Sequence, residues 1–225
     1  MSAKEKFSFK QFIVPNFWKK FVFMAVSILL MGFFLSFLIE VGWGTDPASF
    51  MNLNISAALG WTFGNWQLLL NALMLLIVFF FEPCLIGFGT VFNMVMIGYT
   101  ADFCRWIWKL NGVAAFIAES DFFVRVAIFS LSIICFVFAA AVYMNSRMGL
   151  SPYDGSAKIF SEKLSFLPFF AARIIFDISV VLVGFIASRF AAGGTKSSAV
   201  GATIVGLLLG PAISWVGSKI KPLLD

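Results

Sequence analysis

Gly44-Thr45-Asp46-Pro47 follows the first long apolar run of the chain, and Gly149-Leu150-Ser151-Pro152 follows the fourth. In both opening stretches an Asp or a Ser stands directly before a Pro. Asp and Ser side chains accept hydrogen bonds from free backbone N–H groups at helix starts, and Pro suits the first helical position, where no N–H is needed. Asp154 follows Ser151 by three residues and completes a capping-box pattern. The sequence therefore predicts two short capped helices, over 47–59 and 152–165.

Composition decides the class of protein. Hydrophobic residues make up 61% of the chain and charged residues only 12%, which is more apolar surface than a soluble domain of 225 residues hides in its interior. Apolar runs of the length that crosses a bilayer recur throughout. We therefore predict an all-α membrane protein whose first partner is the lipid bilayer. Its six transmembrane helices are predicted over 18–40, 66–81, 85–108, 122–143, 168–188 and 198–217.

An internal repeat organises these spans. The two opening stretches match each other, and Gly89 and Gly98 match Gly201 and Gly210 with the same internal spacing. Each copy reads span, capped helix, span, turn, span. Because three is an odd number of crossings, the second copy must be inverted across the bilayer. The predicted organisation is a basic cytoplasmic segment over 1–17, repeat 1 over 18–108, a connector over 109–121, repeat 2 over 122–217 and a tail over 218–225.

The basic residues predict orientation rather than nucleic-acid binding. The formal charge is +5, but Lys and Arg stand at the ends of apolar runs instead of on one polar face. Most of them collect on one side if the N-terminus is inside, as the positive-inside rule requires. The N-terminal segment interleaves Lys with aromatic residues, which suits an anionic inner leaflet. We expect a multi-pass membrane protein with both termini in the cytoplasm, and the sequence predicts no oligomeric state.

These motifs resemble one known family. The paired G-x-x-P openings, together with Gly87-Phe88-Gly89-Thr90 and Gly98, are similar to the bacterial YczE/YitT-type integral membrane proteins. The resemblance covers about residues 20 to 218. It departs from the pattern at Val200-Gly201-Ala202, which lacks the Gly-Thr of the first half. The resemblance implies a multi-span protein of the bacterial cytoplasmic membrane, and it supplies no substrate and no catalytic residue.

Several chemistries are disfavoured by what the sequence contains. The chain has no His, and Cys84, Cys104 and Cys135 form no CxxC pair, so we predict no metal site. Gly87-Phe88-Gly89 lies at a membrane span rather than between a strand and a helix, which argues against a phosphate loop. No nucleophile and base can be paired. We therefore expect no enzyme and no cofactor.

Polar residues inside the spans are the candidates for function. Asn71, Asn93, Arg173 and Asp177 are costly against lipid and should point inward. Hydrogen bonding between helices is the favoured explanation for the two Asn residues, and a structural ion pair is an equally serious explanation for Arg173 and Asp177. A solute path is predicted to combine these four residues with Gly87 and Gly89. The repeat-motif positions are Gly44, Asp46, Pro47, Gly149, Ser151, Pro152 and Asp154.

Two classes of function follow from this pattern. The first is a small-solute transporter or permease with its site between the repeats, where helix starts near Asp46 and Ser151 would offer positive dipole ends to an anionic solute. The second is a membrane accessory or regulatory protein that transports nothing. The second class accounts for the lack of a dense polar constellation. An inward-facing polar cavity would favour the first.

Overall fold

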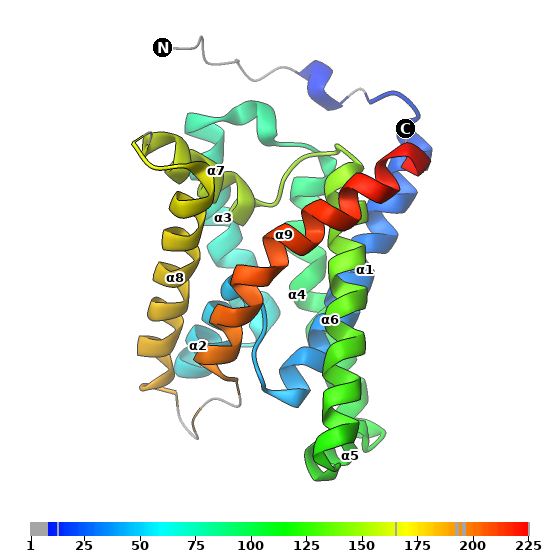
Figure 1. Ribbon diagram of the computed structural model, residues 1–225, viewed down its shortest axis with the longest axis vertical. Coiled ribbons are helices and arrows are strands. Elements are labelled where there is room, and N and C mark those ends of the chain that lie inside the picture. Colours follow the sequence, from blue (N-terminus) through cyan, green and yellow to red (C-terminus); the bar gives the residue numbers. More distant parts are fainter. Residues whose placement is uncertain (1–8, 13, 165, 192–193, 195–196, 225) are drawn as a thin grey trace.

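The computed structural model describes residues 9–12, 14–164, 166–191, 194 and 197–224, and every element in these ranges is a helix (Figure 1). The basic segment before residue 9 and the predicted helix end at 165 lie outside the described residues. The elements are η1 (Phe9–Phe12), α1 (Phe17–Val41), α2 (Pro47–Leu59), α3 (Phe63–Phe81), η2 (Pro83–Leu85), α4 (Phe88–Leu110), α5 (Val113–Glu119), α6 (Phe122–Asn145), α7 (Pro152–Lys163), α8 (Phe169–Ser188) and α9 (Ala199–Leu224).

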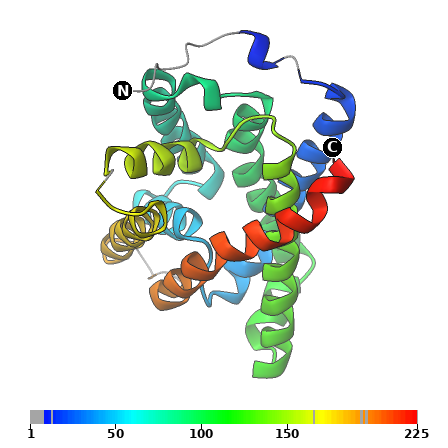
Figure 2. The same cartoon turned by 45° about the horizontal axis from the view of Figure 1, so that its top comes forward.

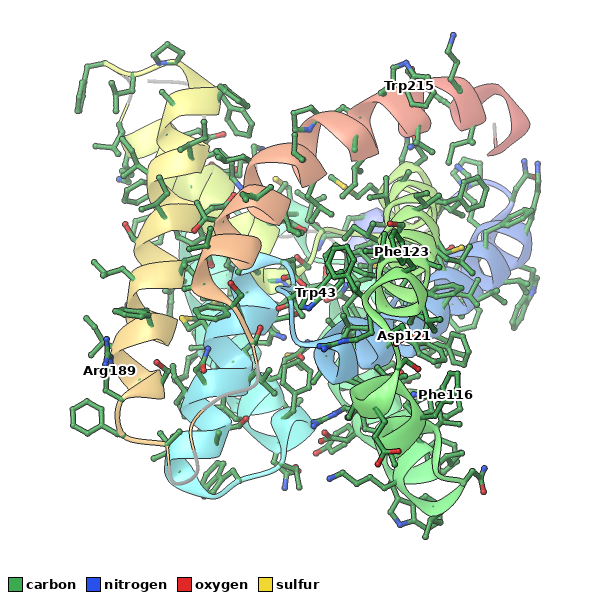
Figure 3. The ribbon with its side chains drawn as sticks, turned by 60° about the horizontal axis from the view of Figure 1, so that its bottom comes forward. Trp43, Phe116, Asp121, Phe123, Arg189 and Trp215 are labelled. Atoms are coloured by element: carbon green, nitrogen blue, oxygen red, sulfur yellow. The ribbon has the colours of Figure 1, made fainter. Side chains whose placement is uncertain are left out.

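Five helices are long and apolar enough to cross a membrane, namely α1, α3, α6, α8 and α9 among the described residues. Their outward faces carry exposed apolar side chains, including Phe123 on α6 and Trp215 on α9 (Figure 3). Such faces suit lipid rather than water. The chain is therefore an all-α membrane protein. The predicted third span, α4, is not among the five, because Asp102, Arg105 and Lys109 stand in its second half.

The most extensive contact between helices joins α1 and α6, with α4 packed on α1 and α9 packed on α6. A large apolar cluster joins these helices, and its fully buried members include Met24, Ile28 and Leu35 from α1. The start of α1 and the end of α9 lie side by side at one end of the molecule in both ribbon views (Figures 1 and 2). The short helix α5 lies at the opposite end (Figure 1).

The two short helices occupy opposite ends of the molecule, α2 below and α7 above in Figure 1. As predicted, α2 begins at Pro47 and α7 at Pro152. Each packs against a helix from the other half of the chain, since α2 lies on α8 and α7 lies on α3. The first short helix ends at Leu59 as predicted, and the second has its last helical residue at Lys163.

Each opening stretch also meets the start of a helix from the other half. The Gly89 N–H donates to the Met148 carbonyl at 2.7 Å, directly before Gly149. At the other end of the molecule, the Ser198 N–H donates to the Gly42 carbonyl at 3.1 Å. Both contacts are close enough to require glycine. A Cβ added to Gly201 would lie 1.6 Å from the Trp43 carbonyl oxygen, and one added to Gly87 would lie 2.2 Å from the Met148 oxygen.

Several boundaries differ from the sequence prediction, and the span predicted from residue 66 begins three residues earlier, at Phe63. The span predicted from residue 85 begins as α-helix only at Phe88, because Pro83–Leu85 forms a separate 3-10 turn. The predicted connector contains a helix, α5, whose single buried apolar side chain is Ile117. Helix α9 extends to Leu224, beyond the predicted end at 217.

The polar end of α4 is fixed to α1 by an ion pair, since Arg105 Nε lies 2.8 Å from Glu40 Oε1 on α1.

Candidate functional site

A cavity of about 460 Å³ lies between the two halves of the chain. Its lining comes from α1, α2, α3, α4 and α6 to α9. The four polar residues predicted to point inward, Asn71, Asn93, Arg173 and Asp177, all line it. Asp46, Pro47, Ser151 and Asp154 from the two helix starts line it as well. The fold thus brings together polar groups that are spread over most of the sequence.

The glycines predicted as site or motif residues do not line the cavity. Gly87 and Gly89 are not among the lining residues, and they pack instead against the backbone of Met148. Gly44, Gly149 and Pro152 are likewise absent from the lining. The structure therefore does not bring Gly87 and Gly89 into the lining of this cavity. Their role in the structure is to let two chain segments approach closely.

Arg173 is the centre of an ionic cluster on one wall of the cavity. Its Nη1 and Nη2 donate to Asp154 Oδ1 at 3.1 and 3.0 Å, and its Nε donates to Asp177 Oδ2 at 3.1 Å. The Tyr153 hydroxyl donates to the other oxygen of Asp177. The guanidinium carbon also lies 5.3 Å from the centre of the Tyr153 ring. The Arg173 and Asp177 pair forms as predicted, and Asp154 joins it from α7.

The two helix starts that face the cavity are capped by the chain itself. Asp46 Oδ1 accepts from the Ser49 N–H at 3.0 Å, and Ser151 Oγ accepts from the Asp154 N–H at 3.0 Å. The Ser151 hydroxyl also donates to Asp154 Oδ2 at 2.7 Å. Burial raises the pKa of the Asp46 carboxyl, because desolvation penalises the charged form, while the hydrogen bond from Ser49 opposes this rise.

Four buried amides also line the cavity. Asn71 and Asn93 are joined by Asn52 from α2 and Gln67 from α3. Neither Asn52 Oδ1 nor Gln67 Oε1 accepts a hydrogen bond from any described residue. Sequence reasoning missed Asn52, Gln67 and Tyr153. Gln67 had a signal, because it stands one helical turn before Asn71 and shares its face.

Capping makes a prediction for stability. We expect Asp46→Ala and Ser151→Ala each to lower the free energy of unfolding by about 0.5 to 2 kcal/mol, since each leaves a helix N–H without its acceptor. Thermal unfolding of the purified protein in detergent measures this. Asp46→Asn is the control, because Asn caps helices as well as Asp does. An unchanged Asp46→Ala variant would contradict the capping role.

Among the described residues, no group of three or more His, Cys, Asp or Glu side chains is placed to hold a metal ion. The cavity presents carboxylates, amides, two tyrosines and one guanidinium. These groups can bind a polar solute by hydrogen bonds and charge.

Comparison with known proteins places the chain in a family. Residues 18–218 match the model of a family of unknown function, DUF6198. The uncharacterized membrane protein YczE of Bacillus subtilis (strain 168) is 24% identical over 145 residues, which cover 64% of this chain and 64% of YczE. The uncharacterized protein YyaS of the same organism is 21% identical over 166 residues, or 72% of this chain and 79% of YyaS. No solved structure matches. The chain therefore belongs to the DUF6198 family of unknown function, a YczE-type family of membrane proteins.

Proposed function

We propose that this protein is a small-solute transporter of the bacterial cytoplasmic membrane, with its solute site in the cavity between the two halves. One observation carries the proposal. The polar residues that are most expensive to bury in a membrane protein converge on one cavity of about 460 Å³. This volume lies in the range of small-molecule sites. A protein that only supports a partner has no need to keep such a cavity open in its interior.

The proposal includes two inverted three-span repeats, with α4 as the sixth span. The contacts that each opening stretch makes with a helix of the other half support this arrangement. The opening stretch before α2 meets the start of α9, and the stretch before α7 meets the start of α4, which is the pairing that a two-fold axis in the membrane plane would produce. The positions of α2 and α7 at opposite ends agree with the same axis (Figure 1). Repeat 1 then covers 18–108, and repeat 2 covers 122–217.

Topology is the first test of this arrangement. We expect a reporter fused after Asn111 to lie outside the cytoplasm and one fused after the last residue to lie inside, because α4 crosses the membrane and both termini share one side. The basic residues near the shared end favour the cytoplasm for it. They include Lys19, Lys20, Lys158, Lys163 and Lys219. An Asn111 fusion that reports the cytoplasm would remove α4 as a span and the inversion with it.

Transport itself is tested with Asn93→Leu. Cells that make wild-type or variant protein at equal levels are compared by untargeted metabolite analysis of cells and medium. We expect a small set of solutes to redistribute with the wild type and not with Asn93→Leu, since the variant replaces a buried cavity amide by an apolar group of similar size. Asn65→Leu is the matched control, because Asn65 is an exposed amide outside the cavity.

The outcomes separate the two classes of function. Redistribution that is lost only in Asn93→Leu supports transport through the cavity. If the wild type redistributes no solute, the transport proposal fails and an accessory role replaces it. If Asn93→Leu acts like the wild type, Asn93 serves packing alone. Flux measured with purified protein in liposomes then confirms the solutes that the cell comparison identifies.

A further inference from the structure

The cavity is closed on one side and open on another. Every lining residue from helices α1, α2, α3, α4 and α7 is buried or half-buried. All but one of the exposed lining residues that the structure describes lie on α8 and α9, and they are Phe169, Phe170, Leu207, Gly210, Pro211 and Ser214. Phe169 is 62% exposed and Leu207 is 40% exposed. The cavity therefore reaches the molecular surface between α8 and α9, and we call these six residues its mouth.

The mouth lies between two helices whose outer faces suit lipid. Among the five apolar spans, α8 and α9 have the smallest shares of buried residues. Val181 and Ala202 join the two helices near α2, and the helices move apart toward the end that carries α7 (Figures 1 and 3). Ser214 is the single polar side chain among the six mouth residues. A rim of this kind on two spanning helices opens toward the hydrocarbon of the bilayer rather than toward water.

Charged groups lie directly inside this apolar rim. Arg173 follows Phe169 by four residues and Phe170 by three, so it lies on the same face of α8, one helical turn further along. Arg173, Asp154 and Asp177 line the cavity with side chains that are 14% to 29% exposed, so polar surface of this cluster is open to the cavity. The lining thus changes from apolar to charged within one turn of helix.

This change of polarity selects a class of ligand. A hydrocarbon would take the charged groups out of water without giving them hydrogen bonds, and a fully polar solute would have to lose its own hydration to pass the apolar rim. A molecule with a polar head and an apolar tail avoids both costs. A cavity of about 460 Å³ suits a small polar head, while the tail stays in lipid and needs no room inside.

We propose that the cavity takes an amphiphile from the bilayer, with its polar head beside the Arg173 cluster and its apolar tail leaving between α8 and α9. This inference rests on the proposed function, because it names the class of solute that the transporter would carry. Binding of the amphiphile does not itself require transport. Since the cluster contains charges of both signs, the test covers heads of each charge.

The test uses photoreactive amphiphiles and the purified full chain in lipid nanodiscs. The probes share one alkyl tail with a diazirine and an alkyne tag, and their heads are phosphocholine, glucoside, sulfate or trimethylammonium. Mass spectrometry locates the labelled peptides after irradiation. Labelling counts as saturable if an excess of the same amphiphile without the diazirine removes it. The tail-less head and the plain alkane are the two control competitors.

We expect at least one probe to label the mouth residues of α8 and α9 saturably, with neither control competitor removing the label. Leu207→Trp narrows the mouth and should lower saturable labelling by on the order of tenfold, because the larger side chain clashes with the tail. Leu208→Trp is the matched control, since Leu208 is the next residue, 65% exposed and outside the lining. Gly210→Leu is a second narrowing variant, because nothing stands within 4 Å of a Cβ added at Gly210. Melting temperatures show that each variant is folded.

Three results overturn the inference: no saturable labelling with any head, removal of the label by the tail-less head or by the alkane alone, or labelling of both narrowing variants at the level of Leu208→Trp. Failure of the proposed function has a different signature. Solutes that redistribute in cells while labelling is absent support transport and overturn this inference. Saturable labelling without any redistributed solute supports the amphiphile site and removes transport.

Discussion

Gly201→Ala is expected to prevent stable folding of the protein. The new Cβ would lie 1.6 Å from the Trp43 carbonyl oxygen and 2.8 Å from its carbon, far closer than the ~3.5 Å of ordinary contact. The obstacle is backbone, which cannot rotate away as a side chain does. Overpacking costs about 1 to 3 kcal/mol where side chains can adjust, and we expect at least about 3 kcal/mol where they cannot. Yield of folded protein in detergent and its melting temperature measure the effect.

The same helix offers a matched control. Gly210 also lies in α9, but nothing stands within 4 Å of a Cβ added there. Gly210→Ala should leave the melting temperature unchanged or raise it slightly, because Ala favours helix over Gly by about 1 kcal/mol. If Gly201→Ala is as stable as Gly210→Ala, the contact between the first opening stretch and α9 does not exist, and the proposed two-fold axis loses one of its two supports.

The sequence predicted what depends on local chemistry. Asp46-Pro47 and Ser151-Pro152 signal helix starts by themselves, and the structure begins both helices there. The cost of polar groups in a membrane predicted that Asn71 and Asn93 face inward, and both line the cavity. These predictions depend only on neighbouring residues in the sequence or on the cost of placing polar groups in a bilayer.

What the sequence could not predict depends on contacts between distant segments. The spacing of Arg173 and Asp177 indicated a pair, but Asp154 reaches Arg173 only because α7 packs beside α8. The glycine at 87 was predicted for a solute path, whereas it faces Met148 from the other half of the chain. Local periodicity carries no information about such a partner. The short helix α5 was missed because its seven residues bury little apolar surface.

The ionic cluster makes the second prediction with a large effect. We expect Arg173→Leu to lower the free energy of unfolding by about 3 kcal/mol, because Asp154 and Asp177 would remain in the cavity wall without their cation. This value is the lower end of the range for broken buried pairs, since the three side chains keep between 14% and 29% of their surface exposed. Arg189→Leu, directly after the last residue of the same helix, should have almost no effect, since Arg189 is exposed at the far end of α8 (Figure 3).

A variant that restores the charge balance shows whether Arg173→Leu destabilises the protein through unpaired charges or through lost packing. In the triple variant Arg173→Leu, Asp154→Asn, Asp177→Asn no carboxylate of the cluster is left without its cation, so most of the lost stability should return. Failure to recover would mean that Arg173 stabilises through its contact with the Tyr153 ring rather than through charge.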